Sequence, residues 1–283
     1  MIDVSFAGPD EREEIATFMA QVFPRAKWGM NAWRRLLDGR WSGDDLPCAV
    51  TARENGALLG VMGLVTARRP TEAGPKLTAN MSSWYILAPH RGRGLGGQMI
   101  ALAKSLPGVT ITDLTSSPLA VGAVRRAGLV PLDDERLLWT PRPGAPRLQV
   151  TPADERAEDL SNKDRQILTD LAGLPQDRVV VETCDGPLLV VRAIKRKHDT
   201  HMTHEILHLG NRARFVAHAR AIATSLLGEA EAKLSLDRRF APNITADAIE
   251  PISVPRFYTP GQMDPAEVDH LYSEVLLLDM KLD

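Results

Sequence analysis

The stretch Ile86-Leu87-Ala88-Pro89-His90-Arg91-Gly92-Arg93-Gly94-Leu95-Gly96-Gly97 joins an apolar segment, which ends at a proline, to a helical-looking segment that ends near Leu106. A helix that begins directly from a tight turn leaves unpaired backbone N–H groups at its first residues. Glycines allow the positive φ angles of such a turn, and the arginines add permanent charge with forked donors. This combination predicts an anion site for a phosphate-bearing ligand, with pyrophosphate as the expected group.

The spacing of the glycines separates this stretch from two other phosphate-binding motifs. A Walker A loop needs Lys-Ser or Lys-Thr after its glycines, and neither pair follows here. A dinucleotide fingerprint reads G-x-G-x-x-G, whereas Gly92, Gly94 and Gly96 follow one another at every second position. The stretch instead resembles motif A of the GCN5-related N-acetyltransferase (GNAT) superfamily, R/Q-x-x-G-x-G/A after a strand that ends in V-x-P.

The resemblance implies that acetyl-CoA, or another acyl-CoA, is the co-substrate and that no metal takes part. It implies a CoA-binding segment made of Leu87, Ala88, Arg91, Gly92, Arg93, Gly94, Leu95, Gly96 and Gly97. The backbone N–H of Leu87 would polarise the thioester or hold the pantetheine. The amides from Arg93 to Gly97 would hold the pyrophosphate.

The segments around the turn predict the fold of the first half. Through about residue 140 the expected order is strand, two helices, three strands, helix, strand, helix, strand, which is the GNAT order. The expected strands are residues 2–6, 49–52, 58–66, 77–87, 109–114 and 129–132. We therefore expect an α/β (α+β) fold in which a mixed, mostly antiparallel twisted sheet is flanked by helices.

The second half is predicted to repeat this order. Residues 141–150 are rich in proline and glycine, so they predict a linker between a GNAT acyl-CoA-binding domain at 1–140 and a second α/β domain at 151–283. The expected elements of the second domain are a helix at 154–172, strands at 178–182, 188–195 and 204–209, a helix at 215–227, and strands at 232–236 and 272–282. This order suggests a degenerate GNAT-like fold in tandem with the first, and two unrelated α/β domains are the alternative.

The turn of the second half has different chemistry. Between Gly210 and Phe215 there is only one glycine, and a bulky ring stands at the helix entrance. We therefore expect no second pyrophosphate cradle.

The resemblance also implies a reaction. An acetyl or other short acyl group would pass directly from CoA to an amine, without a covalent enzyme intermediate. A general base is expected across the cleft, and Tyr85 and Asp113 are the candidate catalytic residues. The acceptor is expected to be a small-molecule or peptide amine. Trp28, Trp33 and Trp41 are expected to pack in the core rather than to bind substrate.

One position departs from the family. The motif B helix commonly carries a tyrosine that protonates the leaving CoA thiolate, and the matching position here is Val124. Valine has no proton to donate. A non-catalytic acyl-CoA-binding regulator or scaffold is therefore a second hypothesis.

A rival motif predicts a third function. His204-Glu205-Ile206-Leu207-His208 matches H-E-x-x-H, which on a helix would make a zinc metallopeptidase site. On a strand, at ~3.3 Å per residue, the two histidine Cα atoms would lie ~13 Å apart and could not share one ion. The apolar run is short and ends at Gly210, so we expect a strand and no metal. Nearby His198 and His201 favour adventitious metal binding.

The composition is that of a globular chain. Of 283 residues, 44% are hydrophobic and 25% are charged, and the formal net charge of -2 gives no reason to expect a nucleic-acid or membrane partner. Cys48 and Cys184 are too few for a disulfide framework. With no signal-peptide pattern and no run of about 18 apolar residues, we expect a cytoplasmic protein. A homodimer is one assembly that the sequence allows.

Overall fold

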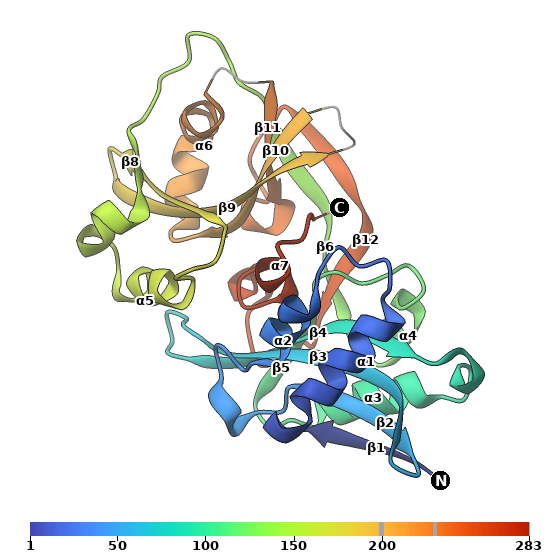
Figure 1. Ribbon diagram of the computed structural model, residues 1–283. Coiled ribbons are helices and arrows are strands. Elements are labelled where there is room, and N and C mark those ends of the chain that lie inside the picture. The colour runs from blue at the N-terminus through green and yellow to red at the C-terminus, as the bar shows by residue number, and fades with distance from the viewer. Residues whose placement is uncertain (198–200, 229–230, 283) are drawn as a thin grey trace. The chain divides into compact units, whose positions relative to one another are not determined.

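The computed structural model describes residues 1–197, 201–228 and 231–282 (Figure 1). The chain divides into two compact units, and neither is a continuous segment. The first unit comprises Met1–Leu132, Val254–Val268 and Tyr272–Met280, and the second comprises Asp133–Ser253, Asp269–Leu271 and the residues from Lys281. Across the described residues, no helix is long and apolar enough to cross a membrane.

The first unit is built on a sheet with the strand order β1-β2-β3-β4-β5-β12. Its strands are β1 (Ile2–Ala7), β2 (Ala49–Glu54), β3 (Ala57–Arg69), β4 (Lys76–Ile86), β5 (Val109–Asp113) and the end of β12 (Ala248–Tyr258). β4 and β5 run parallel, and the other neighbouring pairs are antiparallel. The sheet is therefore mixed and mostly antiparallel, as the sequence predicts.

Helices cover both faces of this sheet. The helices are α1 (Arg12–Val22), α2 (Met30–Leu37), α3 (Leu95–Lys104) and α4 (Val121–Arg126). A side chain at Gly63 of β3 would meet Met19 of α1 and Leu36 of α2. The adjacent β3 residues Met62 and Leu64 belong to the core cluster of α3 and α4. Since neighbouring residues of a strand face opposite sides, α1 and α2 cover one face, and α3 and α4 cover the other.

The two central strands of the first unit separate toward one end. β4 pairs with β5 only from Leu77 to Asn80, opposite Val109 to Thr112, and from there to Ile86 it pairs with β3 alone. A β-bulge shifts its register against β3, and Ser83 within it has a φ of 49°. An extra residue in one strand bends that strand and re-aims its side chains. The bulge thus lies where β4 leaves β5, beside the turn into α3.

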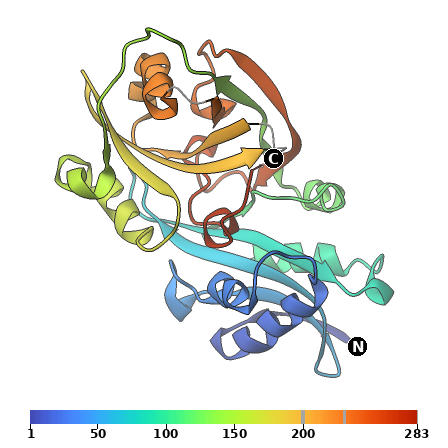
Figure 2. The same ribbon diagram turned by 45° about the horizontal axis from the view of Figure 1, so that its top comes forward.

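The second unit has the strand order β6-β11-β10-β9-β8-β7. Its elements are the larger part of β6 (Val130–Trp139), β7 (Val150–Pro152), α5 (Asn162–Asp170), β8 (Asp177–Thr183), β9 (Gly186–Lys197), β10 (His201–Leu209), α6 (Arg212–Leu227) and β11 (Ala232–Asp237). The buried face of α6 packs on this sheet, with the ring of Phe215 edge-on to Trp139 at 5.7 Å between centroids. α6 is seen nearly along its axis in Figure 1 and from another side in Figure 2.

The second unit repeats the connectivity of the first. The chain passes through β8, β9, β10, α6 and β11 as it passes through β2, β3, β4, α3 and β5. In both series the strands before the helix are antiparallel, and the strand after the helix runs parallel to the one before it. Such a parallel pair needs a crossover connection, which the helix supplies.

Two predicted elements of the second half differ from the structure, and one observed strand was not predicted. The expected strand at 272–282 is wrong, because this stretch forms turns and the short helix α7 (Glu274–Leu277), capped by the Ser273 hydroxyl. The expected helix at 154–172 is divided into a 3-10 segment, Ala153–Asp159, and α5, whose cap is Ser161. β12 was not predicted, since Pro251 and Pro255 lie within it and proline is rare inside strands.

The compact units also differ from the predicted division at 1–140, 141–150 and 151–283. Residues 133–139 belong to the second unit, where Arg136 to Trp139 pair with β11. The last residues of β12 belong to the first unit, where Phe257 and Tyr258 pair with Asp113 and Thr112. Each half of the chain thus contributes a strand to the sheet of the other unit.

Candidate functional site

The turn between β4 and α3 has the geometry of an anion cradle. Gly92 and Gly94 have φ angles of 75° and 78°, in the left-handed region that side-chain-bearing residues rarely adopt. Gly94 is the N-cap of α3, and no side chain caps this helix. The first N–H groups of α3 are therefore left to a ligand or to water.

The backbone of the turn is open to a ligand. A Cβ atom built on Gly92, Gly94 or Gly97 would meet nothing within 4 Å. One built on Gly96 would stand 2.4 Å from the Trp84 ring, so this glycine lets α3 pack against β4. The glycines of the motif therefore divide into an open set around the cradle and one that is needed for packing.

The positive charges near the turn differ in their contacts. Arg91 folds back onto β4, where its Nε donates to the Ile86 carbonyl at 2.7 Å and its guanidinium lies 4.9 Å from the Tyr85 ring centroid. Arg93 is exposed, and none of the ion pairs among the described residues uses it. Lys104 and Arg126 line a groove of about 560 Å³ between α3 and α4 that begins at Gly94 and Gly97. This groove joins the cradle to two further cations.

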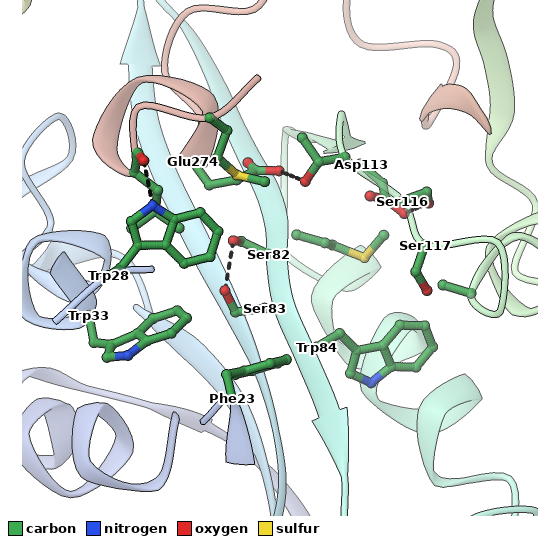
Figure 3. Close-up of a pocket in the computed structure, with 15 residues that line it drawn as sticks. Phe23, Trp28, Trp33, Ser82, Ser83, Trp84, Asp113, Ser116, Ser117 and Glu274 are labelled. Atoms are coloured by element: carbon green, nitrogen blue, oxygen red, sulfur yellow. Dashed lines mark hydrogen bonds between the residues drawn. The ribbon is translucent and has the colours of Figure 1, made fainter. Parts of the chain in front are cut away.

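A cavity of about 230 Å³ lies where β4 separates from β5 (Figure 3). Its walls carry four aromatic rings, two methionines, several hydroxyl groups and two carboxyl groups. The lining residues are Phe23, Trp28, Trp33, Met81, Ser82, Ser83, Trp84, Asp113, Thr115, Ser116, Ser117, Ala120, Glu274, Leu278 and Met280. All of them belong to the first unit, and the last three come from the C-terminal stretch.

The two carboxyl groups are buried and have unusual pKa values. Burial raises the pKa of Asp113 to about 6, against hydrogen bonds from the Ser116 side chain and the Thr115 backbone. Burial also raises the pKa of Glu274 to about 8, and the nearby Asp113 charge adds to this shift. Thr115 and Asn80 donate to Glu274. At neutral pH these pKa values correspond to an ionised Asp113 beside a protonated Glu274.

The structure separates the two candidate catalytic residues. Asp113, at the end of β5, lines the cavity and is 6% exposed. Tyr85 is not among the lining residues, and its ring is edge-on to Phe23 at 5.5 Å and covered by Arg91. The Leu87 N–H donates to the Leu59 carbonyl at 2.8 Å. This donor, expected for the thioester, is therefore already used within the sheet.

Sequence reasoning missed several groups in the cavity. Trp28 and Trp33 were expected in the core. Trp33 is indeed 2% exposed, yet both line the cavity, and Trp28 is held by a 2.7 Å hydrogen bond from Nε1 to the Leu278 carbonyl. Glu274 was not singled out, although a lone carboxyl group in the apolar run from Tyr272 to Leu278 was a signal that could have found it.

The H-E-x-x-H residues do not form a metal site. They lie on β10, a strand as expected, and each has a separate partner. His204 Nδ1 accepts from Arg192 at 2.9 Å, Glu205 pairs with Lys197 at 2.6 Å, and His208 Nδ1 pairs with Asp269 at 2.6 Å. Burial and the Arg192 charge lower the pKa of His204 to about 4. Because the motif lies on a strand, the zinc-peptidase hypothesis is wrong. His198, the nearby histidine of the sequence analysis, lies outside the described residues.

The corresponding turn of the second unit cannot hold a pyrophosphate. The Asn211 side chain caps α6 by accepting from the Arg214 N–H, and the Phe215 ring at the helix entrance is fully buried. The Asp164 carboxylate lies 2.7 Å from where a Cβ on Gly210 would stand. A capped helix start beside a negative charge repels anions, as the glycine-poor sequence predicts.

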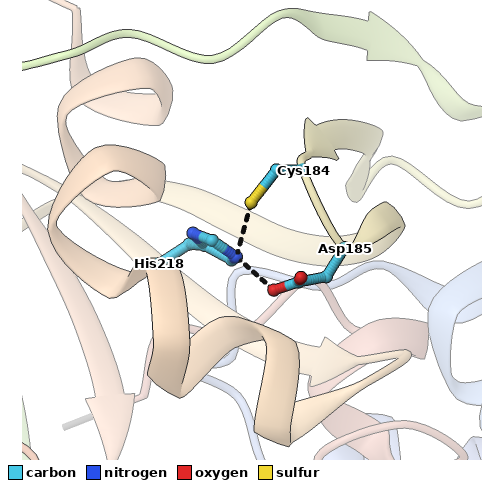
Figure 4. A group of neighbouring side chains, drawn as sticks. All are labelled: Cys184, Asp185 and His218. Carbon is cyan, nitrogen blue, oxygen red and sulfur yellow. Dashed lines mark hydrogen bonds and ion pairs between the residues drawn. The ribbon is translucent and has the colours of Figure 1, made fainter.

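One further group of side chains has metal-ligand chemistry. Cys184 and Asp185, in the turn between β8 and β9, face His218 of α6 (Figure 4). The His218 Nε2 atom lies 2.6 Å from the Asp185 carboxylate and 3.7 Å from the Cys184 sulfur. The same nitrogen makes both contacts, so a metal ion here would have to displace the hydrogen bond to Asp185.

Comparison with solved structures identifies the architecture. A GCN5-related N-acetyltransferase from Anabaena variabilis is similar over 91% of this chain and 72% of its own, with a TM-score of 0.57 and 10% identity. A GCN5-related N-acetyltransferase from Kribbella flavida matches 91% of this chain and 71% of its own, with a TM-score of 0.55 and 10% identity. A conserved protein from Enterococcus faecalis is similar over 91% of this chain and 72% of its own, with a TM-score of 0.54 and 11% identity.

These likenesses confirm the GNAT fold that motif A predicts. At such low identity they concern the fold alone. No protein-family model matches the sequence. No curated protein matches it either.

Proposed function

We propose that this chain is an acyl-CoA-dependent N-acyltransferase that moves an acetyl or other short acyl group to an amine. The open, glycine-lined start of α3 carries this proposal, because it offers uncapped N–H groups and room for the pyrophosphate of CoA. Arg93 would contribute charge at the cradle, and Lys104 and Arg126 would face the remaining phosphate along the groove. The separation of β4 from β5 would admit the pantetheine arm.

In the proposed reaction the amine nitrogen attacks the thioester carbonyl carbon, the C–S bond breaks, and the thiolate takes up a proton. Asp113 is the proposed general base, directly or through water, because it lines the cavity and its pKa of about 6 leaves it ionised at neutral pH. Tyr85 would keep Arg91 and Phe23 in place rather than touch the acceptor. The Leu87 amide would not contact the thioester; its hydrogen bond to the Leu59 carbonyl would instead hold the start of the turn in position.

The group that protonates the thiolate must differ from the tyrosine of motif B. Val124 is fully buried in the core of α3 and α4. The hydroxyl groups of Ser116 and Ser117 line the cavity just before α4, and we propose that one of them, or water, supplies the proton. Since a hydroxyl group holds its proton more tightly than a phenol, we expect slow turnover.

The cradle is tested by two substitutions at one open glycine. Gly97→Glu places a carboxylate at the start of α3 without a clash, and Gly97→Ala adds the same Cβ without charge. By calorimetric titration with CoA, we expect the Glu variant to bind at least tenfold more weakly, and the Ala variant to bind like the parent. Equal affinity of the two variants, or no CoA binding by the parent, would refute the cradle.

The non-catalytic acyl-CoA-binding protein is the second candidate function, and the buried Val124 is the observation that favours it. Amine-dependent release of free CoA thiol separates the two. The assay uses a Cys184→Ser background, because that exposed thiol would react with the detecting reagent. Release above the no-amine rate that is lost in Asp113→Asn supports the enzyme. CoA affinity without release across a panel of amines supports the binding protein.

A further inference from the structure

The cavity beside β4 is walled by aromatic rings that hold one another in place. The rings of Trp28 and Trp33 meet edge to face at 5.8 Å, and Phe23 stacks on Trp33 at 5.6 Å. Figure 3 shows these three rings grouped on one side of β4, with Trp84 on the other. Aromatic faces carry negative electrostatic potential and attract cations as well as apolar groups. A ligand seated here would meet ring faces along much of its length.

The ionisable side chains that line this cavity are acidic. Asp113 and Glu274 line it, and no lysine, arginine or histidine stands among its described lining residues. The hydrogen-bond donors to these carboxyl groups are hydroxyl, amide and backbone groups: Ser116 and the Thr115 backbone for Asp113, and Thr115 and Asn80 for Glu274. Buried carboxylates in proteins are normally neutralised by a cation. A ligand that brings positive charge would complete this site.

The acidic lining of the cavity also disfavours ligands that carry an acidic group. An acidic group on the acceptor would face two carboxyl groups in a medium of low dielectric constant, with no cation to balance it. Amino acids and other carboxylate-bearing amines are therefore disfavoured. The volume of about 230 Å³ suits a molecule smaller than most drug-sized ligands, which occupy pockets of roughly 300–1,000 Å³.

We propose that the acceptor is a small organic cation: a primary amine on an aromatic or alkyl body that carries no acidic group. The ammonium end lies toward Asp113 and Glu274, and the body lies among Phe23, Trp28 and Trp33. The C-terminal stretch is part of this recognition, because it supplies Glu274, and its Leu278 carbonyl orients Trp28. This inference rests on the proposed function for its chemistry, since Asp113 must then take a proton from the bound ammonium.

The test uses two probes that differ only by a carboxylate, phenethylamine and phenylalanine. Binding to the full chain is followed by tryptophan fluorescence, without CoA and with it, and acyl transfer is followed by thiol release. We expect phenethylamine to bind at least tenfold more tightly than phenylalanine and to be the better acceptor by at least the same factor.

Two variants locate the charge that is responsible. Glu274 is protonated at neutral pH, but an ammonium group bound beside it favours the carboxylate, which Gln cannot form. Glu274→Gln keeps the shape of the side chain, and we expect it to weaken phenethylamine binding at least tenfold while CoA affinity is unchanged. Asp279→Asn removes a negative charge from the exposed surface of the same stretch, outside the cavity lining, and should leave amine binding unchanged. A loss of the same size in both variants would overturn the assignment.

The outcomes separate this inference from the function on which it rests. Binding of phenethylamine without any binding of CoA supports the cation site and refutes the acyltransferase. Binding of CoA with transfer to phenylalanine as good as to phenethylamine supports the acyltransferase and overturns the cation site.

Discussion

At the scale of single residues, burial decides which polar groups have unusual properties. His208 is fully enclosed in the second unit with Asp269 and Asp164 on its two ring nitrogens, at 2.6 and 3.6 Å. Burial alone would lower the pKa of His208, but the two carboxylates outweigh it, and the pKa is raised. Burial would likewise raise the pKa of Asp164, and the imidazolium lowers it. The three side chains therefore form a charged, internally paired cluster.

This cluster predicts a pH dependence of stability. Since the folded pKa of His208 lies above its ordinary value of about 6.5, its contribution is complete below that pH and is lost as pH rises through the folded pKa. Urea unfolding between pH 6 and pH 9 should show a declining free energy of unfolding, and the decline should be smaller in His208→Gln. His218→Gln, at a partly exposed histidine of the same unit, is the control. Equal slopes in all three proteins would contradict the prediction.

The two cysteines should differ sharply in reactivity. Cys48 is 3% exposed and burial raises the pKa of its thiol, whereas Cys184 is exposed beside His218. We expect one thiol to react with Ellman's reagent in the folded protein and the second only after unfolding. In Cys184→Ser the fast reaction should vanish. Persistence of a fast thiol in that variant would mean that Cys48 is accessible.

At the scale of elements, the start of α3 combines a ligand site with a packing contact. Gly94 and Gly97 leave its first turn open, and Gly96 lies against the Trp84 ring. The ring in turn lines the cavity. The glycine spacing of the motif thus links the proposed donor site to the proposed acceptor site through one side chain.

Adjacent glycines of this helix are predicted to respond in opposite ways to the same change. Gly96→Ala places a methyl group 2.4 Å from Trp84 and should cost about 1–3 kcal/mol of unfolding free energy through overpacking. Gly97→Ala enters open space and should be neutral or stabilising by up to about 1 kcal/mol. Chemical denaturation of both variants measures the difference. A Gly96→Ala protein as stable as Gly97→Ala would show that Trp84 moves aside without cost.

At the scale of the whole molecule, the two units exchange parts of the chain. The first unit is completed by 254–268 and 272–280, which provide Phe257 to its core and Glu274, Leu278 and Met280 to its cavity. The second unit receives 133–139, of which 136–139 pair with β11. We propose the tandem arrangement of two GNAT-like folds on the basis of their repeated strand order, with strands exchanged between them.

This exchange predicts the behaviour of a fragment. A protein cut after residue 140 lacks the strand that pairs with Asp113 and Thr112, and it leaves the core around Ile111 without Phe257. We expect it to unfold without a cooperative thermal transition, whereas the full chain unfolds cooperatively. A fragment with a sharp transition and parental CoA affinity would show that residues 1–140 are an independent domain.

The sequence by itself determined the features that depend on local chemistry. The glycine spacing predicted a turn with positive φ angles at a helix start, because these are local properties of a few adjacent residues. The resemblance of this turn to motif A then indicated the GNAT fold. The short run ending at Gly210 predicted a strand for His204, Glu205 and His208, which argued against a zinc site, and the structure confirms the strand. The single glycine before Phe215 predicted that the start of α6 has no equivalent cradle.

Only the tertiary structure decided what depends on distant parts of the chain. The apolar run from Tyr272 to Leu278 indicated burial but not secondary structure, since a short buried strand and a short buried helix cannot be distinguished by their apolar pattern. Its capping by Ser273 and its position in the cavity of the first unit depend on contacts with residues almost 200 positions earlier, such as Asn80 with Glu274. For that reason Asp113 was found from the sequence, whereas its partner carboxyl group and the aromatic walls were not.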